Sequence, residues 1–69
     1  MAISLKAARV NAGLSRREVV TDLFKRDSIK ITENTLANYE NKATQPDIIT
    51  AKAIVSIYGM SVDDIQWGA

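Results

Sequence analysis

The chain has 69 residues, a net charge of +1 at pH 7, and neither cysteine nor histidine. At this length it is expected to form a single domain over residues 1–69, which buries only about 60% of its unfolded surface. Disulfide bonds, zinc-finger ligation and catalysis by a thiol or an imidazole are excluded, because the residues that they require are missing. We therefore expect no enzyme, no metal site, no cofactor and no small-molecule substrate.

The apolar residues are distributed along the chain in short groups. None of these groups approaches the roughly 18 consecutive apolar residues that span a bilayer, and the N-terminal residues lack the order of a signal peptide. The sequence predicts a cytoplasmic protein without a membrane partner.

The charge is divided unevenly along the chain. Residues 1–30 carry seven basic and three acidic side chains, a net +4, whereas residues 31–69 carry two basic and five acidic ones, a net −3. Such a dipole can direct one face of the molecule toward phosphate while the other face repels it. The alternative is that both halves are ordinary solvated surface.

Two helices are predicted in the N-terminal half. Residues 5–12 have apolar side chains at helical spacing and are followed by Gly13, which suits a left-handed helix end. The second helix starts at Ser15, which can form a capping box with Glu18. Residues 25–27 can continue this helix on a solvated face. Its expected core-facing stripe is Val19, Val20, Leu23 and Phe24.

A loop and a short third helix follow. The segment Ser-Ile-Lys-Ile-Thr alternates like a strand but has no partner strand, so we expect a loop with Ile29 and Ile31 turned inward. The third helix, capped by Thr32, has only Leu36 and Tyr39 as apolar anchors. Its other face is polar and comprises Glu33, Asn34, Thr35, Asn38 and Lys42. That face is free to contact a partner.

A fourth helix is predicted after Pro46, which cannot continue the third one. Asp47 caps the fourth helix and Gly59 ends it. Its expected inward side chains are Ile48, Ala51, Ile54, Val55 and Tyr58. Residues 60–67 are expected to add a last short turn or helix.

Two features near the C-terminus allow more than one interpretation. Trp67 can cover the core or contact another subunit, since tryptophan is common in both places. Asp63 and Asp64 resemble a paired-carboxylate site, but their position after Ser61 in a first turn indicates capping instead.

The order of these signals resembles the helix-turn-helix domains of phage Cro and repressor proteins. The resemblance covers nearly the whole chain and rests on Leu5, Ala8, Arg9, Gly13-Leu14-Ser15, Thr35 to Asn41, Pro46, and Tyr58 to Asp63. It implies an all-α fold, a compact bundle of about five short helices in which helices two and three form the helix-turn-helix. It also implies that helix three lies in the major groove of DNA.

The resemblance further implies which residues contact DNA. Arg16 and Arg17 match positions of the family that bind DNA phosphates. Asn34, Thr35 and Asn38 match the helix face that contacts base edges. Lys30 and Lys42 are expected to add phosphate contacts. Each residue also has a structural explanation: Thr35 can serve only the cap, Asn38 can be plain helix surface, and Arg17 can pair with Asp22.

Two features depart from the family. Eight residues separate Leu23 from the cap Thr32, where the family has two or three, so the angle between helices two and three is open. Helix three also contains Glu33 and Glu40 but no basic residue before Lys42, although arginine and lysine make the commonest contacts to guanine.

These departures leave two main hypotheses. In the first, the chain is a Cro-like transcriptional regulator that binds double-stranded operator DNA as a homodimer in a phage-type genetic switch. In the second, it is an antirepressor that uses Glu33, Asn34, Asn38 and Glu40 to bind the basic DNA surface of a partner repressor protein. The two roles can combine in a joint complex on DNA, and a scaffold or toxin-associated regulator is a third alternative.

Overall fold

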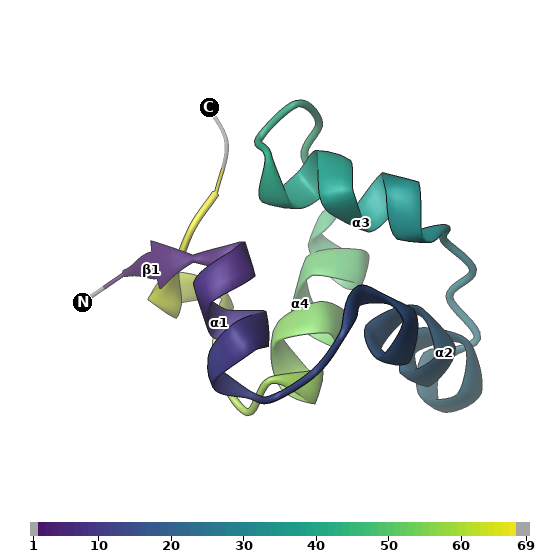
Figure 1. Ribbon diagram of the computed structural model, residues 1–69. Coiled ribbons are helices and arrows are strands. Elements are labelled where there is room, and N and C mark those ends of the chain that lie inside the picture. The colour runs from purple at the N-terminus through teal and green to yellow at the C-terminus, as the bar shows by residue number, and fades with distance from the viewer. Residues whose placement is uncertain (1, 68–69) are drawn as a thin grey trace.

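Four α-helices account for most of the structure, a computed structural model that describes residues 2–67 (Figure 1). The elements in chain order are β1 (Ile3–Ser4), α1 (Leu5–Asn11), α2 (Arg16–Asp27), α3 (Glu33–Glu40), α4 (Ile48–Ile57), the 3₁₀ turn η1 (Val62–Asp64) and β2 (Ile65–Gln66). The all-α helix-turn-helix bundle is confirmed, with four α-helices instead of about five. None of the described helices is long and apolar enough to cross a membrane.

Each α-helix begins at a side chain that accepts a hydrogen bond from the backbone of its first turn. The acceptors are Ser4, Ser15, Thr32 and Asp47, at 3.0, 3.1, 3.0 and 3.2 Å from the N–H groups of Ala7, Glu18, Thr35 and Thr50. Glu18 completes the predicted capping box by accepting the N–H of Ser15 at 2.9 Å, and this bond lowers the pKa of its carboxyl. The starts at Ser15, Thr32 and Asp47 were predicted from the sequence, whereas the start at Ser4 was not.

Each α-helix also ends in the same way, with a residue of positive φ. Gly13 and Gly59 have φ of 74° and 73°, while Ser28 and Lys42 reach 55° and 63° despite their side chains. The residue after each one donates its N–H to a carbonyl in the last turns of the helix. These hydrogen bonds run from Leu14 to Arg9, from Ile29 to Leu23, from Ala43 to Asn38 and from Met60 to Val55. These bonds satisfy carbonyls that a helix end leaves unpaired. Of these four helix ends, only the two at glycine were predicted from the sequence.

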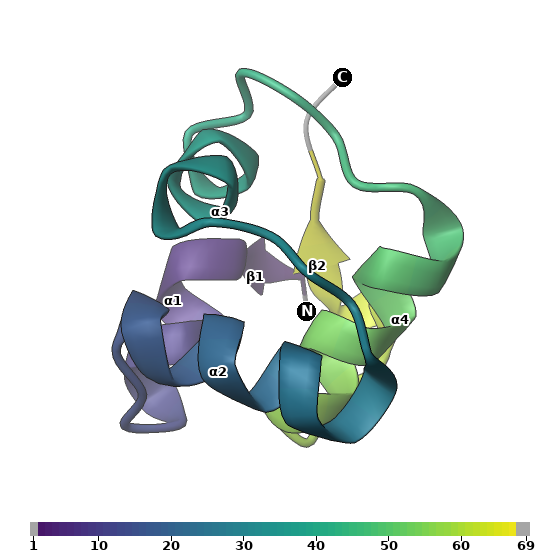
Figure 2. The same cartoon turned by 90° about the vertical axis from the view of Figure 1, so that its right-hand side faces the viewer.

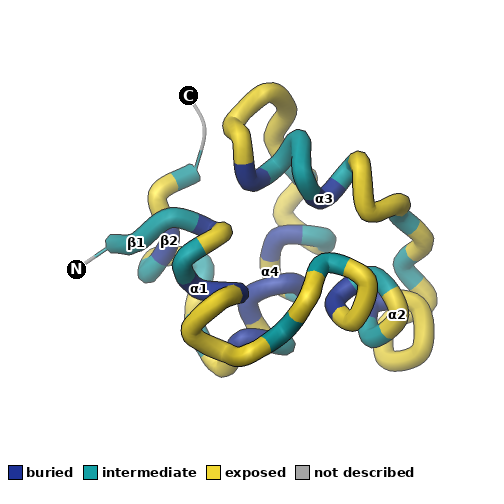
Figure 3. The backbone as a smooth tube through the Cα atoms, viewed as in Figure 1, coloured by how far each residue is buried: buried dark blue, intermediate teal, exposed yellow. Residues whose placement is uncertain are grey.

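The core lies where the four helices meet. Its largest fully buried side chains are Val19, Leu23, Leu36 and Ile54. Ile29 and Ile31 pack against this cluster from the loop, as predicted. In Figure 3 the buried turns of α4 lie between α1 and α2.

Two predicted core residues are on the surface. Phe24 is 59% exposed and Ile48 is 58% exposed. In α2 the buried residues Val19 and Leu23 are four apart, so a fifth position is turned by about 100° out of the packed stripe. Ile48 is the first residue of α4, and the buried residues of this helix begin only at Ala51.

The segment after α4 forms more than the expected short turn. After η1, β2 pairs in parallel with β1, with Ile3 opposite Ile65 and Ser4 opposite Gln66. Figure 1 shows β1 on the opposite side of the molecule from α2. Trp67 packs against the core and donates its Nε1–H to the Val62 carbonyl at 3.0 Å. Of the two interpretations of this residue, the structure therefore agrees with the one in which it covers the core.

The aspartates beside this turn have a structural role. Asp64 accepts the N–H of Ser61 at 3.1 Å, which confirms the capping interpretation for that residue. Asp63 lies on the exposed surface next to it.

Candidate nucleic-acid interface

The polar face of α3 lies on the surface, as the sequence predicted. Leu36 is completely buried and Tyr39 packs against the core, so these two anchors fix the helix from one side. On the other side Glu33 and Asn34 are exposed, and Asn38 is half-buried. Because side chains three and four apart share a helix face, Asn34 and Asn38 point in the same direction.

Thr35 belongs to the same helix, but its polar groups are engaged locally. Its N–H donates to the Thr32 hydroxyl at 3.0 Å, and the two hydroxyl oxygens are also 3.0 Å apart. Its hydroxyl therefore takes part in the cap at the start of α3. This agrees with the alternative in which Thr35 serves the cap.

Basic side chains lie at both ends of α3. Lys30 precedes the helix in the linker and Lys42 follows it, and both are exposed. The helix has 8 residues, which corresponds to a length of about 12 Å. Cations thus flank a short polar surface that carries the two asparagines.

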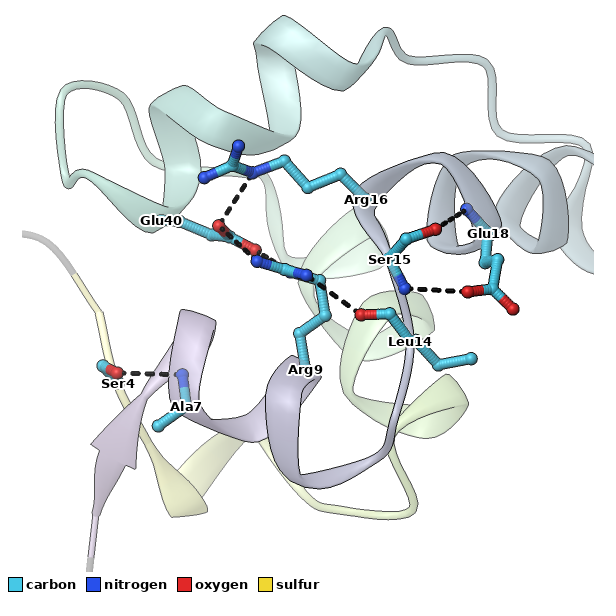
Figure 4. A network of polar contacts seen from close by, with 8 residues as sticks. All are labelled: Ser4, Ala7, Arg9, Leu14, Ser15, Arg16, Glu18 and Glu40. Atoms are coloured by element: carbon cyan, nitrogen blue, oxygen red, sulfur yellow. Dashed lines mark hydrogen bonds and ion pairs between the residues drawn. The ribbon is translucent and has the colours of Figure 1, made fainter.

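The first turn of α2 contributes two arginines beside the C-terminal end of α3. Arg17 is exposed, and it makes no ion pair with any residue between positions 2 and 67, so the expected alternative of a pair with Asp22 is not formed. Arg16 donates its Nε–H to Glu40 at 3.0 Å, and its side chain is 36% exposed. Of the Arg16 guanidinium nitrogens, Nε is the one joined to Glu40 in Figure 4, and the two terminal nitrogens make no hydrogen bond within residues 2–67.

Glu40 is the centre of an ion-pair network that joins three helices (Figure 4). Its carboxylate accepts the Nε–H of Arg9 in α1 at 2.6 Å and that of Arg16 in α2 at 3.0 Å. Arg9 also donates to the Leu14 carbonyl at 2.9 Å. The side chain of Glu40 has no exposed surface. This network fixes the last turn of α3 against α1 and α2.

The position of Glu40 corrects one prediction. It was expected on a surface for a partner protein, but it is buried because two arginines neutralise it inside the fold. The role of Arg9 as a buried partner of Glu40 was not predicted. The available signal was its position at helical spacing from Leu5 and Ala8, on the core-facing side of α1, where a buried cation needs an acidic partner.

Tyr58 lies close enough to this network to be affected by it. Its hydroxyl is buried and makes no hydrogen bond within residues 2–67. Burial first, and then the Glu40 carboxylate, raise the pKa of the hydroxyl far above its ordinary value of 10.0. The neutral phenol is therefore strongly favoured in the folded protein.

We expect alkaline unfolding to depend on Tyr58. A raised pKa in the folded state means that its contribution is complete below pH 10.0 and is lost as the pH rises above that value. Tyr58→Phe should flatten the fall in stability above that pH, and at neutral pH it should leave stability unchanged or raise it by up to about 1 kcal/mol. Urea denaturation across this pH range measures both effects, with Tyr39→Phe as the control. Parallel curves for Tyr58→Phe and the unchanged chain would contradict the expectation.

These features define a class of protein: a small helical domain that presents one short polar helix, flanked by cations, on a rigid support. A family model described as helix-turn-helix matches residues 5–65. The chain belongs to this family of the Cro and C1 repressor type, and it is a DNA-binding transcriptional regulator. The family is a regulatory one and not a family of enzymes. Neither the curated proteins nor the solved structures gave a match.

Proposed function

We propose that the chain is a Cro-like regulator of a phage-type genetic switch, which binds operator DNA with α3 in the major groove. The single observation that carries this proposal is the polar face of α3 between basic residues at both of its ends. A major groove about 12 Å wide admits one α-helix. In this position the helix would meet base edges while the flanking cations meet the two phosphate backbones.

The proposal assigns a DNA contact to each of the polar and basic side chains described above. Asn34 and Asn38 bind adenine through the paired donor and acceptor of their amides, and the methyl group of Thr35 can contact thymine. The phosphate contacts come from Arg16, Arg17, Lys30 and Lys42. The N–H groups at the start of α2 support the phosphate that Arg17 and Arg16 approach, because a helix N-terminus attracts anions.

Arg16 is suited to a phosphate because Glu40 already holds its Nε–H. A free arginine loses side-chain entropy when it binds an anion, whereas a side chain fixed by one bond has less to lose. Its two terminal nitrogens remain available for the anion.

We further propose that two copies of the chain bind a palindromic operator. In this arrangement the two α3 helices lie about 34–36 Å apart, one turn of DNA, and contact successive major grooves. Each subunit then contacts one of two half-sites that have the same sequence.

Selection from a randomised double-stranded DNA library tests the proposal, because it requires no knowledge of the operator. We expect a palindromic sequence to be enriched. Its affinity, measured by fluorescence anisotropy, should fall with salt at a logarithmic slope of about −3 for each subunit. An unenriched library, together with equal weak binding to every duplex, would contradict DNA recognition by the chain alone.

A second candidate function is supported by the charge of the exposed face. The net charge of +1 is low for a domain that binds DNA alone, and Glu33 is exposed at the start of α3. In this proposal Glu33, Asn34 and Asn38 bind the arginines and lysines with which a partner repressor holds its operator. Addition of the chain to such a repressor on its DNA should then release or remodel that complex. An unchanged complex would exclude this role for the repressor tested.

Lys42 offers a test that separates stability from DNA binding. Its φ of 63° is unfavourable for a residue with a side chain, so Lys42→Gly should stabilise the fold by about 1 kcal/mol. The same change removes a proposed phosphate contact, and it should reduce the magnitude of the salt slope by about 1. Urea denaturation and anisotropy measure the two effects. Ser28→Gly at the end of α2 is the control, since it should stabilise the fold without changing the slope.

A further inference from the structure

An apolar groove lies on the outer side of α2, apart from the polar face of α3. It is lined by Val20, Thr21, Phe24, Lys25, Lys30 and Ile31. One wall is α2, and the other is the linker of residues 28–32. Figure 2 shows this linker running across the front of the molecule from the end of α2 to the start of α3.

The aromatic ring in this groove is unusual for so small a domain. Phe24 is the single phenylalanine of the sequence, yet more than half of it is exposed, at 59%. A short chain has little apolar area with which to build a core. Single exposed apolar residues are common, but here Val20 and Ile31 line the same groove, which makes a continuous apolar surface.

The charges around the groove indicate what can occupy it. Lys25 and Lys30 line it, and no acidic residue does. Duplex DNA would use the lysines, but its sugar-phosphate backbone would leave the phenylalanine and the aliphatic side chains without an apolar partner. A ligand with both carboxylates and large apolar side chains satisfies the two kinds of surface together.

Two other exposed apolar residues, Ile48 and Ile49, lie in a different electrostatic setting. They are 58% and 69% exposed. One groove beside each contains Lys52 together with Asp63 or Asp27, and a further groove beside Ile48 has no charged residue in its lining. None of these surfaces carries only positive charge. The groove beside Phe24 carries only positive charge, and it therefore selects one class of ligand.

We propose that this groove is a protein-docking site that takes an acidic segment of a partner protein, with one or two large apolar side chains seated against Phe24. The apolar side chains of the segment contact Val20, Phe24 and Ile31, while its carboxylates pair with Lys25 and Lys30. The site goes beyond the proposed DNA contact, because Phe24 and Lys25 are not part of that surface; Lys30 is the one residue that the two proposals share. The groove is then a second contact surface of the regulator, formed mainly by α2.

A synthetic peptide that alternates aspartate and glutamate with leucine and phenylalanine is a direct probe of this site. Titrated into the ¹⁵N-labelled chain, it should cause saturable amide shifts concentrated in residues 20–31, and binding should weaken with salt. Phe24→Ser and Lys25→Glu should each lower the affinity by about five- to thirtyfold, the range typical of a central interface residue. A peptide with lysine in place of the acidic residues should bind more weakly by a similar factor.

The control variants use residues of similar exposure elsewhere. Val10 is 57% exposed on α1, so Val10→Ser matches Phe24→Ser, and Lys52→Glu matches Lys25→Glu; neither should change peptide binding. Operator binding by Phe24→Ser should equal that of the unchanged chain, which keeps this test independent of the proposed DNA contact.

Several results would overturn the docking site. These are shifts outside the groove, the absence of shifts, equal binding of the basic peptide, and peptide binding that Phe24→Ser leaves intact. Shifts of the same amides on dilution of the chain alone would instead assign the groove to a second copy, and shifts caused by duplex DNA would assign it to nucleic acid.

Discussion

Replacement of Glu40 by leucine is expected to destabilise the fold by about 3–5 kcal/mol, since loss of one partner leaves a buried charge uncompensated. The charge is that of Arg9, whose side chain is only 11% exposed and which bonds Glu40 at 2.6 Å. Domains of this size have a total stability of only about 5–15 kcal/mol. The variant should therefore lose a large share of its stability and unfold at a clearly lower urea concentration than the unchanged chain. Urea denaturation followed by circular dichroism measures the loss.

Two further variants distinguish the ion pair from a simple packing effect. The double variant Arg9→Met with Glu40→Leu removes both charges, and it should recover much of the lost stability, because apolar pairs often replace buried ion pairs without loss. Glu33→Gln changes an exposed acid of the same helix and should alter stability by less than about 0.5 kcal/mol. A Glu40→Leu variant that unfolds at the same urea concentration as the unchanged chain would show that the network does not hold α3 in place.

Replacement of Asn38 by alanine is expected to relax base preference with little effect on stability. If Asn38 reads one adenine, the loss of its paired hydrogen bonds should reduce discrimination at that base pair by about 1–3 kcal/mol, or roughly five- to 150-fold. Asn34→Ala should do the same at a neighbouring base pair, because both side chains share one face of α3. Anisotropy against the selected operator and its single-base variants measures the change.

Arg17→Ala is the matched comparison for these asparagine variants. It removes an exposed cation that contacts no base in the proposal, so it should weaken binding to all sequences alike and reduce the salt slope by about 1. If both asparagine variants fold normally and keep the affinity and the base preference of the unchanged chain, α3 does not read the bases. The antirepressor role would then be the better account of its exposed face.

The presentation of α3 depends on contacts from both of its sides. Leu36 is fully buried beneath it, and Glu40 ties its last turn to α1 and α2. The linker before it is longer than the family norm, but α2 continues to Asp27, so part of the expected loop is helix. The remaining linker is held where Ile29 and Ile31 pack against the core.

The sequence by itself determined where three of the four α-helices begin. Ser15, Thr32 and Asp47 were identified correctly because a cap is a bond between residues three apart, and so it depends only on local sequence. Gly13 and Gly59 were identified as helix ends for the same reason, since only glycine adopts a positive φ without strain. The two apolar anchors of α3 followed from helical periodicity, which is also local.

The tertiary structure alone decided the features that depend on residues far apart in the chain. Arg9 and Glu40 are 31 positions apart, so no local pattern shows that they neutralise each other, and Glu40 looked like surface. Ser28 and Lys42 take positive φ because the packing of the next segment requires the turn there, against their own preference. Phe24 faces outward because the helices around α2 cover only the side of it that carries Val19 and Leu23. How much of the surface of α2 is covered depends on how whole helices pack against one another.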